Sequence, residues 1–184
     1  MDAIWQSFLL VALSEMGDKT QLLALILAIR FKKPWPIMAG ILVATLLNHG
    51  LASAVGGWLA SLADPSTLRY LLAALFIGFG AWILVPDKAD AMPSAPSYGA
   101  FVTTVVAFFL AEMGDKTQLA TIALGARFQA PISVTIGTTL GMLAADGLAV
   151  AFGERLTNIV PMKYVRLAAA LLFIGFGGYV LLTM

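Results

Sequence analysis

The pattern of apolar and polar positions divides the chain into six long apolar segments. Charged residues, prolines and glycines separate segments at approximately 3–29, 35–62, 67–85, 98–126, 131–153 and 164–183. Each is near or above the roughly 20 residues that a helix needs to cross the hydrocarbon core of a bilayer. The pattern therefore predicts an all-α integral membrane protein with six transmembrane helices.

The composition supports a lipid environment. Of the 184 residues, 60% are apolar and 11% are charged, whereas soluble domains have about 45–50% and about 25%. The lipid bilayer is thus the expected partner of most of the chain. The net charge of +1 gives no reason to expect nucleic-acid binding, and the lack of cysteine excludes disulfides and thiolate metal sites.

The two halves of the sequence repeat each other at a constant offset of 97 residues. Residues 15–22 are identical to 112–119, and the Phe-Ile-Gly-Phe-Gly stretch at 76–80 recurs at 173–177. We interpret the glycines of the second stretch as helix-packing positions, because small residues let helices approach closely. The simplest account of the common offset is a duplication followed by fusion.

The stretch between the halves has the proline-rich and polar composition of a linker. We therefore expect one membrane domain made of a three-helix repeat at 1–85, a linker at 86–97 and a second three-helix repeat at 98–184. Three crossings per repeat would place the second repeat in the membrane upside down. Such inverted repeats are typical of secondary transporters whose binding site lies near the bilayer midplane.

Basic residues in the predicted connections indicate the orientation. One side would carry Arg30, Lys32, Lys33, Lys88, Arg155, Lys163 and Arg166, and the other Arg69 and Arg127. Cytoplasmic loops are enriched in lysine and arginine. The more basic side should therefore be cytoplasmic, with both termini outside.

The duplicated stretch Glu-Met-Gly-Asp-Lys-Thr-Gln places charge in the middle of the first and fourth segments. Its charged residues are Glu15, Asp18, Lys19, Glu112, Asp115 and Lys116. A charged side chain at such depth costs at least about 2.5–3.5 kcal/mol. These residues are therefore expected to face a polar cavity or one another, forming an ion site between the repeats.

The side chains of the two motifs form an all-oxygen ligand set. On a continuous helix, Glu15, Asp18 and Gln21 would share one face, and Gly17 would allow local unwinding. The second copy adds Glu112, Asp115 and Gln118, and the hydroxyls of Thr20 and Thr117 lie beside them. Calcium, manganese and magnesium prefer such oxygen ligands.

Charge counting favours a divalent cation. Four carboxylates and two ammonium groups sum to −2, which one divalent ion neutralises. An empty site in a low dielectric would be expected to take up protons instead, so the motifs suggest cation/proton exchange.

Two questions about the motif residues stay open. The acids could form a purely structural salt-bridge network, with Glu15 or Asp18 paired to Lys19. Lys19 and Lys116 could either be carboxylate partners that tune the site or turn toward polar loop regions.

Other polar residues lie within apolar segments. Asp146 is a lone carboxylate that could be an extra ligand or a proton carrier, or could serve packing. At the 97-residue offset its counterpart is His49, next to Asn48. That polar pair could join the site or satisfy hydrogen bonds between helices.

The double Glu-Met-Gly-Asp-Lys-Thr motif resembles the Glu-x-Gly-Asp-(Lys/Arg)-(Ser/Thr) family of manganese and calcium transporters, which includes bacterial manganese exporters of the MneA type. The resemblance covers essentially the whole chain. It implies a multi-pass protein of the bacterial inner (plasma) membrane that exports Mn²⁺ from the cytoplasm, with protons as the counter-ion. It also implies that the motif acids bind the metal.

Three alternatives to manganese export remain. A Ca²⁺/H⁺ exchanger would use the same ligands. An intramembrane aspartyl protease would use Asp18 and Asp115 as a proton-sharing dyad and would not need Glu15 or Glu112. An exporter of small organic cations would need a roomier cavity with an aromatic lining. The transporter interpretation predicts no enzyme activity and no cofactor.

Overall fold

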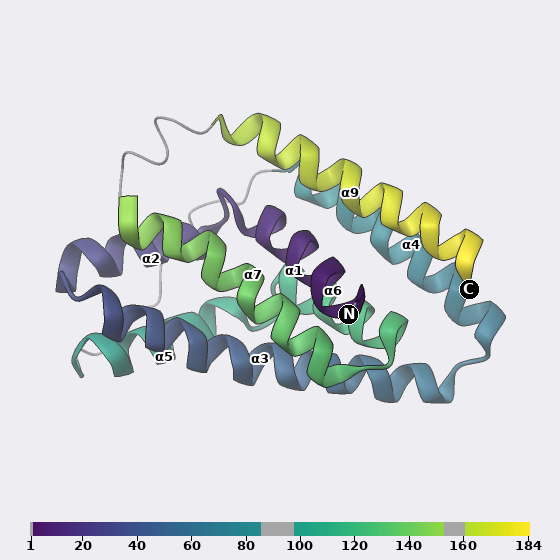
Figure 1. Ribbon diagram of the computed structural model, residues 1–184, viewed down its shortest axis with the longest axis horizontal. Coiled ribbons are helices and arrows are strands. Elements are labelled where there is room, and N and C mark those ends of the chain that lie inside the picture. The colour runs from purple at the N-terminus through teal and green to yellow at the C-terminus, as the bar shows by residue number, and fades with distance from the viewer. Residues whose placement is uncertain (1, 86–97, 153–160) are drawn as a thin grey trace.

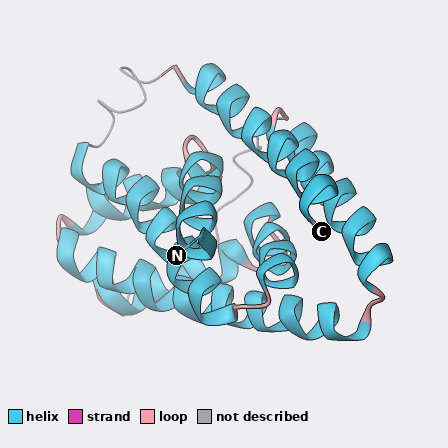
Figure 2. Cartoon of the chain, turned by 45° about the vertical axis from the view of Figure 1, so that its right-hand side comes forward, coloured by secondary structure: helices cyan, strands magenta, loops and turns pink. Residues whose placement is uncertain are grey.

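A computed structural model describes residues 2–85, 98–152 and 161–184, and this part of the chain is helical without strands (Figures 1 and 2). The first half contains α1 (Asp2–Glu15), α2 (Lys19–Phe31), α3 (Pro34–Leu62) and α4 (Pro65–Ile83), and the second contains α5 (Ala100–Glu112), α6 (Lys116–Phe128), α7 (Pro131–Phe152) and α9 (Met162–Thr183). The all-α prediction is confirmed. The expected linker at 86–97, including Lys88, and the loop residue Arg155 lie outside the described residues.

The apolar segments at 3–29 and 98–126 both break at the duplicated motif, where Gly17 was expected to allow local unwinding. Gly17 and Gly114 have φ values of 82° and 77°, a left-handed conformation that suits glycine. The backbone N–H of Gly17 donates to Gln21 Oε1 at 2.9 Å, and that of Gly114 donates to Gln118 Oε1 at 2.8 Å. Each motif therefore separates two short helices.

Four described helices, α3, α4, α7 and α9, are long and apolar enough to cross a membrane. α1 and α5 are apolar but contain only 14 and 13 residues. In Figure 1, α1 and α2 follow one another along the long axis of the bundle, so the motif lies partway along it.

The two C-terminal helices of the repeats pack against each other reciprocally. α4 and α9 lie side by side (Figure 1). A Cβ at Gly80 would lie 2.8 Å from the Ala170 carbonyl oxygen, and one at Gly177 would lie 3.0 Å from that of Ala73. The same position of each repeat thus meets the same position of the other. The contacts confirm the predicted packing role of these glycines and show that α4 and α9 run antiparallel.

The remaining helices form a core with the same reciprocity. α1 packs on α7, where Gly137 meets the Ile4 carbonyl, and α5 packs on α3, where Gly40 meets the Phe101 carbonyl. Gly137 lies 97 residues after Gly40, and Phe101 lies 97 residues after Ile4. The contact between α3 and α5 is therefore the counterpart of the contact between α7 and α1.

α3 and α7 cross in opposite directions near the centre. The Met38 side chain lies against Gly147, whereas the Ser53 hydroxyl meets Thr135 near the start of α7. Corresponding helices of the two repeats therefore run antiparallel here as well.

The α4–α9 pair departs from this reciprocity where it meets the core. α9 packs on α1 and α4 packs on α6, but within the described residues the counterpart contacts of α4 with α5 and of α9 with α2 are not comparably made. Apolar grooves of about 460 and 440 Å³ flank the pair, one lined by Leu10 and Leu171 and the other by Leu75 and Leu119. The pair thus meets the core at α1 and α6 and not equally at their counterparts α5 and α2.

Candidate functional site

The acids of both motifs lie at helix ends that meet inside the protein. Glu15 and Glu112 are the last residues of α1 and α5, and Asp18 and Asp115 precede α2 and α6. Their exposed fractions are 0% for both glutamates, 6% for Asp18 and 8% for Asp115. The prediction that Glu15, Asp18 and Gln21 share one helical face is wrong, because residues 16–18 are not helical.

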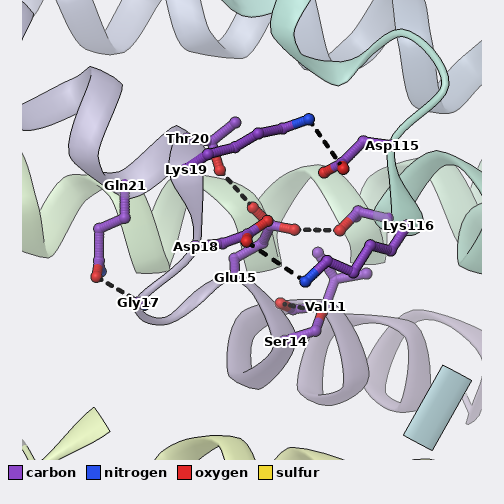
Figure 3. Close-up of polar contacts among 11 residues, drawn as sticks. Val11, Ser14, Glu15, Gly17, Asp18, Lys19, Thr20, Gln21, Asp115 and Lys116 are labelled. Carbon is purple, nitrogen blue, oxygen red and sulfur yellow. Dashed lines mark hydrogen bonds and ion pairs between the residues drawn. The ribbon is translucent and has the colours of Figure 1, made fainter. Parts of the chain in front are cut away.

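Both lysines reach across to the opposite motif (Figure 3). Lys19 Nζ lies 2.9 Å from Asp115 Oδ1, and Lys116 Nζ lies 3.6 Å from Asp18 Oδ1. Neither aspartate makes a side-chain capping bond to the helix that it precedes. Of the two positions considered for the lysines, the structure therefore shows them as carboxylate partners.

Glu15 and Glu112 have different surroundings although they occupy the same position in two identical motifs. Glu15 accepts a hydrogen bond from Thr20 Oγ1 at 2.7 Å and another from Thr117 Oγ1, so hydroxyls of both motifs converge on one carboxylate. Within the described part of the chain, neither carboxylate oxygen of Glu112 has a hydrogen-bond partner. A fully buried carboxylate without partners is costly, and it therefore marks a position able to bind a cation or a proton.

The glutamines hold the backbone around the acids. Gln21 Oε1 and Gln118 Oε1 accept from the glycine N–H groups of the breaks, and Gln21 Nε2 donates to the Ala145 carbonyl on α7 at 2.8 Å. An amide oxygen has a second lone pair, so this bond leaves each glutamine oxygen able to accept another contact.

Asp146 lies next to a residue that contacts the first motif. Its side chain is fully buried, and neither oxygen has a hydrogen-bond partner among the described residues. The carbonyl of the preceding residue, Ala145, accepts a hydrogen bond from Gln21 of the first motif. The structure thus brings this acid to the motifs.

Asn48 and His49 are buried on α3. Asn48 Nδ2 donates to the Phe109 carbonyl of α5 at 3.1 Å, which matches the interhelical bond considered for it. His49 is fully buried, and within the described ranges both ring nitrogens lack a hydrogen-bond partner.

The acids form a dispersed cluster. Among the residues that the structure describes, no three histidine, aspartate or glutamate side chains form a group that could hold a metal ion. Two cavities of about 10 Å³ adjoin Asp18 and Lys116, each large enough for about one water molecule. Binding a metal ion would therefore require these side chains to move closer together.

Arg166 also lies beside the site, although the sequence indicated for it only a part in the membrane orientation of the chain. Arg166, at the start of α9, lines a small cavity with Asp18, Lys116 and Ile83 of α4. The sequence shows that Arg166 corresponds to Arg69 at the repeat offset. Its position near the motif depends on how the α4–α9 pair packs.

Comparison with known proteins identifies relatives over nearly the whole chain. Residues 3–91 and 100–184 match the family described as divalent cation/proton antiporter GDT1. A Vibrio cholerae protein named "Putative manganese exporter" is 45% identical over 95% of this chain and 88% of its own length. GDT1-like proteins of Synechocystis and Arabidopsis thaliana are 30% and 31% identical, over 94% and 97% of this chain and 93% and 94% of theirs. No solved structure matches.

Proposed function

Because the chain belongs to the GDT1 family of divalent cation/proton antiporters, we propose that it exports Mn²⁺ from the cytoplasm in exchange for protons, through a site formed by its two acidic motifs. The family is one of transporters rather than a class of enzyme. The observation that carries the proposal is the meeting of four buried motif acids from both repeats, linked by contacts between the motifs.

The metal ligands in this proposal are the oxygen atoms of both motifs. Glu15, Asp18, Glu112 and Asp115 supply charge, Gln21 and Gln118 supply amide oxygens, and Thr20, Thr117 and Asp146 lie within reach of the same cluster. A divalent ion offsets the −2 sum of the motif charges, and protons replace it on the return step. Asn48 and His49 are proposed as polar neighbours on α3.

The proposed membrane arrangement has six crossings in two inverted repeats. α1 with α2, and α5 with α6, would each cross as one discontinuous span broken at the ion site, as occurs in other secondary transporters. The antiparallel course of α3 against α7 and of α4 against α9 supports the inversion. The distribution of lysine and arginine favours both termini outside the cytoplasm, in the bacterial inner membrane.

Manganese is proposed over calcium because of the name of the Vibrio cholerae relative. Oxygen ligands alone would accept either ion. Competition between Mn²⁺ and Ca²⁺ for flux in the same vesicles distinguishes the two.

Metal flux in proteoliposomes tests the proposed function. Vesicles containing the purified protein and loaded with Mn²⁺ should release it when an opposing proton gradient is imposed, with proton movement followed by an entrapped pH dye. Asp18→Asn and Asp115→Asn should each abolish the flux, because each removes a charge from the cluster. Asp64→Asn is the matched control, since Asp64 is an exposed N-cap of α4 and asparagine caps equally well.

Wild-type rates in Asp18→Asn or Asp115→Asn would contradict a site built from both motifs. Loss of flux in Asp64→Asn as well would show that the assay reports folding rather than the site.

A further inference from the structure

Lys19 and Lys116 occupy positions where helix stability does not favour a positive charge. They are the first residues of α2 and α6, and the N-terminal end of a helix carries a partial positive charge that favours acids over bases. Both copies of the motif place lysine at this position. The stability of their own helices therefore does not explain the lysines.

Their partners do explain them. Each ammonium group lies against an aspartate of the other repeat, at 2.9 Å for Lys19 with Asp115 and 3.6 Å for Lys116 with Asp18. The aspartates are more than nine-tenths buried, so water cannot compensate their charge. The lysines supply the positive charge that a metal ion would supply at the same oxygen atoms.

The two ion pairs differ in how well they are covered. Residues of the α4–α9 pair, including Ile83 and Arg166, enclose the cavity beside Asp18 and Lys116. The exposed fraction of the Lys116 side chain is 13%, whereas that of Lys19 is 32%. In this arrangement Lys19 and Asp115 are therefore the pair that an arriving ion reaches more easily.

We propose that Lys19 and Lys116 are tethered substitute cations, which neutralise Asp115 and Asp18 while no metal is bound and are displaced by the arriving divalent ion. This proposal rests on the proposed function. One divalent ion replaces two ammonium groups, so the charge at the aspartates is the same before and after the exchange. Lys19 is displaced first from the arrangement described here.

Chemical labelling of the lysines tests the displacement directly. The purified full-length protein is reductively methylated with formaldehyde and a borohydride at increasing Mn²⁺, and the rate at each lysine is read by mass spectrometry. Reductive methylation requires the neutral amine, and pairing with a carboxylate favours the ammonium form, so the Lys19 rate should rise several-fold along the Mn²⁺ binding curve. Exposed Lys33 is the internal reference and should not change.

Two variants provide controls for this measurement. In Asp115→Asn, Lys19 has lost its charged partner and should react at the fast rate without metal. In Lys19→Gln, the competitor of the metal is absent, so the dissociation constant for Mn²⁺ should fall about tenfold, the equivalent of about 1.4 kcal/mol. Lys33→Gln is the matched control and should bind Mn²⁺ as the wild type does.

The possible outcomes separate this inference from the function beneath it. Mn²⁺ binding with an unchanged Lys19 rate, or weaker binding in Lys19→Gln, would overturn the displacement and leave the transporter proposal standing. A wild-type protein that neither binds nor moves Mn²⁺ would remove both. The labelling of the wild type decides the question even if Lys19→Gln does not fold.

Discussion

The two copies of the motif have the same sequence from glutamate to leucine but different surroundings. In the first copy, Glu15 accepts hydroxyl hydrogen bonds from both motifs, whereas Glu112 of the second has none within the described residues. The difference follows the packing around them: α9 lies against α1, which carries Glu15, and α4 makes no comparable contact with α5. Two identical motifs therefore have different hydrogen-bonding environments within one asymmetric arrangement.

The largest effect is expected from removing the glutamate charges. Glu15→Gln and Glu112→Gln should each lower Mn²⁺ flux by at least a hundredfold, because each removes a carboxylate of the proposed metal site. Full activity of Glu15→Gln in proteoliposomes would contradict a cage that needs both glutamates.

The same two variants should move thermal stability in opposite directions. Without metal, Glu112→Gln should raise the unfolding midpoint, because it removes an acidic group that is fully buried and has no hydrogen-bond partner within the described residues. Glu15→Gln should lower the midpoint, because hydrogen bonds to a charged acceptor contribute about 1.5–3 kcal/mol. Equal shifts measured in detergent would show that the two surroundings do not differ in energy.

Removing one hydroxyl tests the convergence on Glu15. Thr117→Val should destabilise the protein by about 1–3 kcal/mol, since it leaves a buried carboxylate with one donor fewer. Thr121→Val is the matched control, because within the described ranges its hydroxyl bonds only to the Thr117 carbonyl of its own helix. Thermal unfolding of the two variants should separate them, and equal midpoints would argue against the cross-motif bond.

The glycines of the two breaks should differ by a smaller amount. Gly17→Ala and Gly114→Ala both place a side chain at positive φ, which costs about 1–2 kcal/mol. A Cβ at Gly17 would also lie 3.0 Å from Met162 Sδ, whereas one at Gly114 would have nothing within 4 Å. Gly17→Ala should therefore unfold at the lower temperature. A lower unfolding temperature for Gly114→Ala would show that Met162 of α9 does not pack closely against Gly17.

The position of the α4–α9 pair can be followed by cross-linking, since the chain has no cysteine. Leu10→Cys with Leu171→Cys spans the groove between α1 and α9 and should react with a short bismaleimide in the arrangement described. Ala107→Cys with Ala74→Cys is the same pair at the repeat offset and should react less. An equal cross-linking yield from both cysteine pairs would show that α4 approaches α5 as often as α9 approaches α1.

Much of the fold could be predicted from the sequence because bilayer crossing is controlled by local composition. The helices of the two repeats correspond at the offset seen in the sequence, and the second glycine of each Phe-Ile-Gly-Phe-Gly stretch packs as expected, whereas a Cβ at Gly78 or Gly175 would have nothing within 4 Å. The helix breaks were only partly foreseen: Gly17 indicated local unwinding, but the same-face argument assumed a helix through Asp18. The hydrogen bonds from Gln21 and Gln118 that close the breaks depend on a turn geometry that spacing alone does not give.

The sequence alone determined that the chain is helical and apolar, that its halves are copies, and that acids stand in the middle of its first and fourth apolar segments. These properties follow from residue type and order. Only the tertiary structure decided that Lys19 and Lys116 each pair with the aspartate of the other motif. It also decided that the hydroxyls of Thr20 and Thr117 both bond to Glu15, and that Asp146 lies next to the carbonyl that Gln21 binds. Such contacts depend on how distant helices pack, and two identical motifs carry no local signal that tells one from the other.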